Sequence, residues 1–170
     1  MFQPKIPPNT GNIVRLCKNT GSKLHLIKPL GFEISEKSVK RAGMDYFEFQ
    51  NISIYENFEE FIISRNDRNF FLITKFGKIS YEKVKYSFGD YLIFGSEDNG
   101  LSDQIYKKLK NSPKIFIPMM PMNRSLNLSN AVSICIYCNV PLPLRPSYFR
   151  DGLFACDHGV CLCDDGQANL

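Results

Sequence analysis

Residues 114–136 constrain the fold more than any other stretch of this 170-residue chain. The apolar run 115–117 predicts a buried strand that ends at Pro118. Residue types that favour helix starts come next: Ser125, Asn127 and Ser129. Residues 131–136 are apolar at nearly every position and predict a buried helix. Since the first N–H groups of a helix lack partners within it, this strand, polar loop and helix favour a site for an anion or a cofactor.

Strand and helix patterns alternate along the rest of the chain. Short apolar runs predict strands at 24–27, 47–54, 70–73 and 90–94, while helical patterns cover 13–20, 35–42, 57–64 and 102–109. Residues 6–12 are interpreted as a rigid turn followed by capping residues, Ser102 as a helix cap, and 75–87 as unassigned. The alternation predicts an α/β fold with a mostly parallel sheet.

Composition indicates one globular domain and is compatible with a phosphate-bearing partner. Apolar residues make up 44% of the chain, and no apolar run reaches the roughly 18 residues that span a bilayer. The first five residues resemble no signal or transit peptide, so we expect a cytoplasmic protein with reduced cysteines and no membrane partner. Residues 1–50 contain eight basic and four acidic side chains, an excess equal to the net charge of +4. A nucleic acid or a solvated lysine-rich surface explains this excess equally well.

Three predicted strand ends are candidates for a ligand site: 72–74, 95–97 and 117–119. Ligands of parallel sheets bind at the carboxyl ends of strands. Taken alone, Gly95–Gly100 is more simply a tight turn, and 125–130 an ordinary helix cap. His25 alternates with apolar residues and is interpreted as a strand residue rather than a catalyst. The sequence contains no dinucleotide fingerprint, P-loop or zincin motif.

The combination of these motifs is more specific than each alone. Asn12-x-x-Arg15 is followed by Gly95-x-Glu97-x-x-Gly100-Leu101, and then by 117–119 with 125–131. In this order and spacing, they resemble the three motifs of the SpoU branch of the SPOUT methyltransferases. Residues 6–12 and 41–46 narrow the resemblance to the subgroup that methylates the ribose of cytidine or uridine 34 in tRNA. The resemblance covers residues 1–137.

This resemblance implies a C-terminal trefoil knot, a homodimer, and a reaction that transfers a methyl group from S-adenosylmethionine to a wobble ribose of tRNA, not DNA. It places the cofactor near Leu72, Gly95, Glu97, Ile117 and Ser125. It makes Arg15 and Asn12 the catalytic pair, with Arg15 close to the partner subunit's cofactor, and requires no metal. Because a guanidinium stays charged, Arg15 suits a phosphate or a developing oxyanion rather than a proton.

Both ends of the chain depart from the family pattern. Only five residues precede Ile6, so the family's first strand is expected to be short or missing. Pro141 and Pro143 interrupt the last helix, and residues 138–170 form an atypical tail. The tail holds four possible zinc ligands: Cys156, His158, Cys161 and Cys163. Their spacing fits no standard zinc pattern, so we favour a disordered or aberrant tail over a zinc site.

The leading hypothesis is therefore a tRNA 2′-O-methyltransferase. A non-catalytic RNA-binding protein on the same fold is the alternative, because the altered ends could have removed the activity. An unrelated α/β enzyme that acts on a small molecule is a more distant third.

Overall fold

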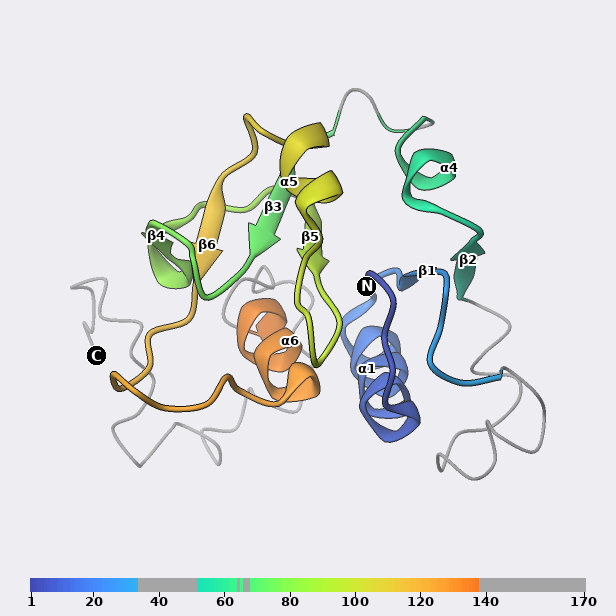
Figure 1. Ribbon diagram of the computed structural model, residues 1–170, viewed down its shortest axis with the longest axis horizontal. Helices are drawn as coiled ribbons and strands as arrows, with labels where there is room; N and C mark the ends of the chain where they lie inside the picture. The colour runs from blue at the N-terminus through green and yellow to red at the C-terminus, as the bar shows by residue number, and fades with distance from the viewer. Residues whose placement is uncertain (34–51, 64, 66–67, 138–170) are drawn as a thin grey trace, which may run out of the picture.

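The computed structural model describes residues 1–33, 52–63, 65 and 68–137 (Figure 1). Its helices are α1 (Pro7–Thr20), α4 (Phe58–Ile63), the short 3-10 helix η1 (Tyr81–Lys83), α5 (Asp103–Lys108) and α6 (Leu128–Tyr137). Its strands are β1 (His25–Ile27), β2 (Ser53–Tyr55), β3 (Phe70–Ile73), β4 (Ile79–Ser80), β5 (Tyr91–Phe94) and β6 (Lys114–Phe116).

All strand pairs between these elements are parallel. One sheet has the order β4-β6-β3-β5, and a smaller one pairs β1 with β2. The central strands β3 and β5 pair along their whole length, from Phe70 opposite Tyr91 to Ile73 opposite Phe94. The predicted α/β fold with a mostly parallel sheet is thus confirmed, and β3 has the bounds that its apolar run predicted.

The first residues of the chain connect the two sheets. Phe2 bridges Ile27 of β1 in parallel, and its backbone N–H donates to the Phe94 carbonyl of β5 at 2.8 Å. The residues before Ile6 therefore act as a very short strand between β1 and β5, and Figure 1 shows the N-terminus at this position.

Helices cover both faces of the larger sheet, because successive strand residues point to opposite faces. Leu72 and Ile93 pack in a core with Phe58, Phe61 and Ile105, residues of α4 and α5. Phe94 packs on the other face, in a core with residues of α1 and α6. Figure 1 shows α1 and α6 side by side near the carboxyl ends of β3, β5 and β6.

Helix α1 begins earlier than predicted. Pro7 and Pro8 occupy its first two positions, so the interpretation of residues 6–12 as a rigid turn with capping residues is wrong. Proline is tolerated there because the first N–H groups of a helix have no partner inside it. The predicted end is confirmed: Gly21 adopts φ +69° at the C-cap.

Helix α6 is less buried than its sequence predicted. Only Ser129, Val132 and Cys135 are buried, at a spacing of three that faces α1, while Tyr137 is exposed. The prediction of a helix buried on nearly every side is therefore wrong for the chain alone. Ser102 precedes α5 as predicted, but its buried hydroxyl makes no capping hydrogen bond.

Several predictions fall outside the described residues: the helix at 35–42, most of the strand at 47–54, and the tail from 138 onwards. The unassigned segment 75–87 contains β4 and η1. None of the helices that the structure describes is long and apolar enough to cross a membrane.

Candidate active site

A cleft of about 620 Å³ opens at the carboxyl ends of β3, β5 and β6. This volume lies within the roughly 300–1,000 Å³ typical of sites for small molecules. Residues 73–76, 94–101, 117, 119 and 124–128 line it, together with Ile6, Asn9, Tyr106 and Ala131. The three strand ends that the sequence singled out therefore converge on one cavity.

The loop after β5 is closed tightly on itself. Ser96 and Gly100 exchange backbone hydrogen bonds of 3.1 and 3.0 Å. A Cβ atom at Gly95 would lie 2.0 Å from the Gly100 carbonyl carbon, a contact that no side chain can make. Gly100 itself adopts φ +68°, which favours glycine. The motif is thus a tight turn, as its sequence suggested, and the turn forms one wall of the cleft.

The Glu97 carboxylate fixes this loop to the start of α1. Its Oε2 accepts the backbone N–H of Lys5 at 2.8 Å, and its Oε1 accepts that of Ile6 at 3.2 Å. Oε1 also accepts Nδ2 of Asn9 at 3.0 Å. An acceptor with negative charge at the beginning of a helix is favourable, since it satisfies free N–H groups and the helix dipole. Glu97 therefore holds together segments that are some 90 residues apart in the sequence.

Asn9 extends this network to the loop before α6. Nδ2 of Asn127 donates to Oδ1 of Asn9 at 2.9 Å. Oδ1 of Asn127 accepts the backbone N–H and the hydroxyl of Ser129, at 2.9 and 2.7 Å, so that Asn127 caps α6. The buried Asn9 thus connects Glu97 with Asn127, and one polar chain joins the elements on three sides of the cleft.

An ion pair reinforces the same junction from outside. Lys5 Nζ lies 2.5 Å from Asp98 Oδ2. This hydrogen bond from Lys5 is the main reason that the pKa of Asp98 falls to about 2. Asp98 is therefore charged at neutral pH, beside the Glu97 contacts.

Two hydroxyl groups define the wall on the β3 side. Thr74 Oγ1 and the Tyr106 hydroxyl lie 2.8 Å apart, and Thr74 Oγ1 also accepts the backbone N–H of Phe76 at 3.3 Å. Lys114 Nζ lies over the Tyr106 ring, 5.0 Å from its centroid, and makes a cation–π contact with it. This arrangement joins α5 to the end of β3.

Four of the residues predicted to bind the cofactor meet in the cleft: Gly95, Glu97, Ile117 and Ser125. Leu72 does not, because its side chain is fully buried in the core and the cleft begins one residue later, at Ile73. Asn12 and Arg15 are exposed on α1, and neither lines the cleft of this chain.

Sequence reasoning missed two residues of the site, Asn9 and Tyr106, whereas Thr74 belongs to the predicted strand end 72–74. Asn9 was interpreted as part of a turn, although its position directly after the Pro7-Pro8 pair at a helix start could have placed it on the inner face. Tyr106 lies in a helix that gave no functional signal in the sequence.

A second cavity of about 430 Å³ lies between α1, β5 and α6. It is lined by Cys17 and Cys135, and burial raises the pKa of the Cys17 thiol to about 11. A thiol with such a pKa is protonated at neutral pH and a weak nucleophile. Among the described residues, no group of three or more His, Cys, Asp or Glu side chains could hold a metal, and Cys138 and the cysteines after it lie outside them.

The fold and the cleft define an α/β protein with a cleft for a small molecule at the carboxyl edge of its parallel sheet. The model of the SpoU rRNA Methylase family matches residues 1–137, and the chain belongs to this family. A tRNA (cytidine(34)-2'-O)-methyltransferase from Aeromonas hydrophila is 47% identical over 137 residues, which cover 81% of this chain and 88% of the relative.

Solved structures agree with this assignment. A structure that concerns 2-OH methylation of C/U34 on tRNA is 37% identical, with a TM-score of 0.72, and the match covers 80% of this chain and 88% of that one. An AdoMet-bound rRNA methyltransferase from Sinorhizobium meliloti shares the fold at 24% identity, with a TM-score of 0.68 and coverage of 81% of this chain and 52% of that one.

Proposed function

We propose that this protein is a tRNA (cytidine/uridine-34) 2′-O-methyltransferase, which transfers a methyl group from S-adenosylmethionine to the wobble ribose. The observation that carries this proposal is the cleft built from the three family motifs, in a chain 47% identical to an enzyme named for that reaction. The intact polar network of Glu97, Asn9 and Asn127 favours an active enzyme over a non-catalytic RNA-binding protein.

The residues of the cleft fit a cofactor of this size and chemistry. Gly95 and Gly100 add no side chains to the turn wall of the cleft, and Ile73, Ile117 and Leu128 provide apolar surface. Thr74 and Ser125 contribute hydroxyl groups. We assign cofactor binding to Gly95, Ile117 and Ser125. Glu97 shapes the site by holding the loop after β5. Leu72 does not contact the cofactor and contributes only by holding Ile73 in place.

When bound, S-adenosylmethionine supplies a methyl group on a sulfonium, an electrophile that needs no metal. Arg15 carries five N–H donors in a rigid fork and remains charged, so it can hold an RNA phosphate and stabilise negative charge that develops on the ribose oxygen. Arg15 does not line the cleft of its own chain, although it is exposed on α1 together with Asn12. We therefore assign both residues to the cleft of a partner subunit.

A homodimer follows from this assignment and agrees with the surface of α6. Ile134 and Ile136 are only half-buried, and Tyr137 is exposed, although the helix is apolar on most sides. A second copy that packs against α1 and α6 would bury this surface and bring Arg15 towards the other cleft. Because the proposed substrate is a tRNA, the proposal includes a cytoplasmic location.

A knotted path of the chain is also part of the proposal. Strand β6 inserts between β4 and β3, which come earlier in the sequence. Gly77 passes so close to β6 that a Cβ there would lie 2.4 Å from the Ile115 carbonyl carbon. This crowding supports a loop of the chain that is drawn tightly around later residues, as the family's trefoil knot requires.

The test combines transfer and mapping. The purified chain is incubated with unmodified tRNA and labelled S-adenosylmethionine, and ribose methylation is mapped by its resistance to alkaline cleavage. We expect a single 2′-O-methyl group at position 34 and, for Arg15→Lys, a rate about 100- to 1,000-fold lower with nearly unchanged cofactor affinity. If cofactor and tRNA bind but no methyl group is transferred, the chain is the non-catalytic alternative.

Sedimentation tests the dimer separately. We expect a dimer whose dissociation accompanies loss of transfer, since each cleft needs Arg15 of the other subunit. A mixture of Arg15→Lys and Gly95→Ala chains should regain part of the activity, because one of the two clefts in a mixed dimer is intact. An active monomer would contradict the shared site.

A further inference from the structure

An exposed group of apolar and cationic side chains surrounds the outer edge of the cleft. We call it the rim patch, and it consists of Lys75, Phe76, Met119, Met120, Met122 and Arg124. Lys75, Phe76, Met119 and Arg124 line the cleft itself, while Met120 and Met122 lie in the same loop between β6 and α6. We infer that the rim patch stacks an unpaired base of the RNA beside the nucleotide to be methylated, an inference that rests on the proposed function.

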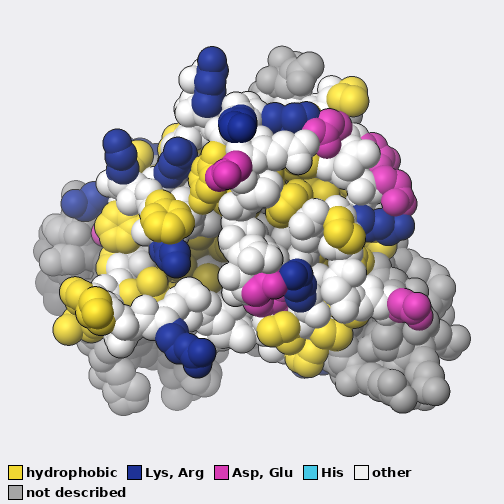
Figure 2. All heavy atoms as spheres, in the orientation of Figure 1, with side chains coloured by type: hydrophobic (Ala, Val, Ile, Leu, Met, Phe, Trp, Pro, Cys, Tyr) yellow, Lys and Arg dark blue, Asp and Glu magenta, His cyan; other side chains and the backbone are white. Residues whose placement is uncertain are grey.

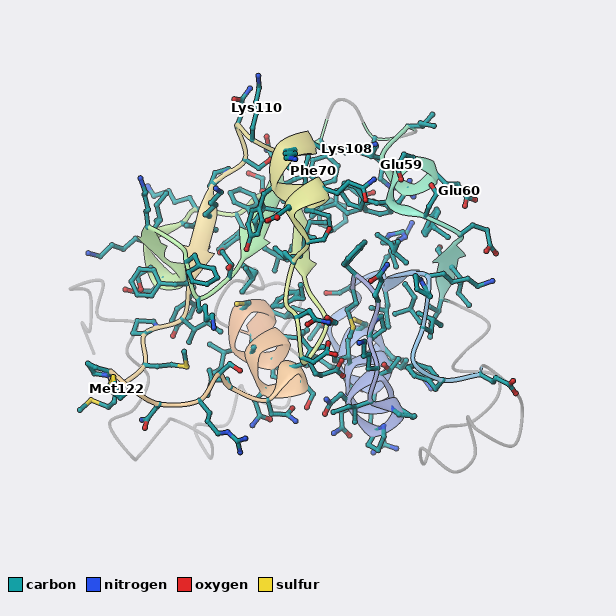
Figure 3. All side chains as sticks on the ribbon, viewed as in Figure 1. Glu59, Glu60, Phe70, Lys108, Lys110 and Met122 are labelled. Atoms are coloured by element: carbon teal, nitrogen blue, oxygen red, sulfur yellow. The ribbon has the colours of Figure 1, made fainter. Side chains whose placement is uncertain are left out.

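The exposure of the apolar members is the first argument. Phe76 is 69% exposed and Met120 is 74% exposed, and Met122 is fully exposed. Most large apolar side chains of the described residues are buried, so an exposed group of four at the entrance of a cleft indicates a contact surface. Figure 3 labels Met122, whose side chain points away from the rest of the protein.

The geometry of the two loops is the second argument. Phe76 follows Thr74, whose hydroxyl is held by Tyr106 and in turn accepts the Phe76 N–H. The base of the β3 loop is therefore fixed while the Phe76 ring remains exposed. In the loop between β6 and α6, Met122 adopts φ +66°, a backbone conformation that non-glycine residues rarely adopt.

Charge decides what kind of partner fits this surface. Lys75 Nζ lies 5.2 Å from the centroid of the Phe76 ring, and Arg124 follows Met122 by two residues. Neither Lys75 nor Arg124 forms an ion pair with another described residue. Figure 2 shows lysine, arginine and apolar side chains interspersed on the left of that view, whereas most acidic side chains lie to the right.

Single-stranded nucleic acid matches this combination. An aromatic ring stacks on a base, neighbouring cations contact the phosphates, and flexible methionine side chains adapt to the base surface. A wobble nucleotide lies in an anticodon loop, where neighbouring bases are unpaired and can reach such a ring. A second copy of this chain fits less well, because its corresponding surface has the same charge.

The experiment measures RNA affinity for four variants of the full chain by fluorescence anisotropy. The RNA is an anticodon stem–loop, and a fully paired duplex of similar length is the comparison. The variants are Phe76→Ala, the pair Met120→Ser with Met122→Ser, Lys75→Ala, and the control Phe88→Ala. Phe88 is 90% exposed but lies in the wall of the second cavity, away from the rim patch.

We expect Phe76→Ala to weaken stem–loop binding about 5- to 150-fold and the methionine pair to weaken it less. Lys75→Ala should reduce the slope of log affinity against log salt by about 0.7–1. Phe88→Ala should bind the stem–loop like the parent, and all variants should bind the duplex like the parent. Cofactor affinity from calorimetry should be unchanged for Phe88→Ala and for the methionine pair, whose residues do not line the cleft.

Three results would overturn the inference: stem–loop affinity of Phe76→Ala equal to the parent's, an equal loss on the duplex, or a changed sedimentation coefficient without a change in RNA affinity. The last of these would identify the rim patch as a contact between copies. A parent chain that binds the stem–loop through Phe76 but transfers no methyl group would contradict only the proposed function. A parent that methylates position 34 while Phe76→Ala binds normally would contradict only this inference.

Discussion

The amino and carboxyl ends of β3 and β5 are surrounded by different kinds of contacts. At the amino end, Phe70 and Tyr91 stack with ring centroids 5.3 Å apart, and Phe61 packs against both rings. The Arg65 guanidinium lies 4.6 Å from the Phe61 ring centroid and donates to the hydroxyl groups of Tyr55 and Tyr91 at 2.6 and 3.1 Å. Figure 3 labels Phe70 at this end.

At the carboxyl end, polar contacts between distant segments replace the aromatic packing. Glu97, Asn9 and Asn127 connect the surrounding loops, and a cleft remains between them. Buried aromatic rings stabilise the folded protein through their packing. Polar groups around an open cavity contribute less to stability, because part of their surface remains available to a ligand. We therefore expect substitutions at the amino end to change unfolding, and substitutions at the carboxyl end to change binding and transfer.

Among substitutions that test this comparison of the two strand ends, Gly95→Ala should have the largest effect on activity. A Cβ at this position would overlap the Gly100 carbonyl, so the loop must move and the transfer rate should fall about 100-fold or more. Gly21→Ala is the control, because Gly21 also has positive φ but no atom within 4 Å of a new Cβ. It should cost roughly 1–2 kcal/mol of stability and leave the transfer rate unchanged. Equal rates for parent and Gly95→Ala would show that this loop does not shape the site.

Phe61→Ala should have the largest effect on stability. Phe61 is 2% exposed and contacts the rings of Tyr55, Phe58, Phe70 and Tyr91. Urea unfolding should show a loss of about 3–5 kcal/mol, while Ile63→Ala, on the exposed side of α4, should change stability by about 0.5 kcal/mol or less. Cofactor affinity of the folded Phe61→Ala protein should match the parent's, and a large loss of affinity would mean that the two ends are coupled.

Asn9→Ala should weaken cofactor binding through the loops. The substitution leaves Glu97 and Asn127 without their shared partner, at a cost of about 1–3 kcal/mol. Calorimetry should show a matching rise in the dissociation constant. Asn12→Ala, three residues further along α1 on its exposed side, should bind the cofactor like the parent. A larger loss of cofactor affinity for Asn12→Ala than for Asn9→Ala would contradict the role assigned to Asn9, since the sequence indicated Asn12 as a catalytic residue.

A pH dependence from His25 should be the smallest effect. Burial, with smaller contributions from the charges of Arg65, the N-terminus and Lys23, lowers the pKa of His25 to about 4. The unfolded chain, with an ordinary histidine pKa near 6.5, then binds the proton more readily than the folded protein between about pH 4 and 6.5. Stability should therefore fall as the pH is lowered through this range. His25→Gln should show a shallower fall, and identical slopes would contradict the low pKa.

The central strands could be predicted from the sequence because their apolar runs are short and bounded by turns. The cleft could be predicted because parallel strands bring their carboxyl ends together, which placed Gly95, Ile117 and Ser125 in one cavity. Asn9 could not, since its role depends on Glu97, 88 residues away. A pattern of local signals contains no information on which distant side chain completes a hydrogen bond.

The start of α1 and the burial of α6 also depend on contacts that local sequence patterns do not contain. Pro7 and Pro8 are equally compatible with a turn and with the first positions of a helix, and here Glu97 favours the helix by accepting the backbone N–H of Ile6 just before it. The apolar sequence of α6 predicted burial, but in a single chain only its face towards α1 is buried.

Hydrogen exchange with and without S-adenosylmethionine tests the central claim most directly. If the cleft at the carboxyl end holds the cofactor, amide protection should rise in residues 74–76, 95–101 and 118–128. The amino ends of β3 and β5 around Phe70 and Tyr91, and the wall of the second cavity at residues 86–89, should exchange as before. Protection confined to the second cavity, with no change in the three loops, would contradict the account.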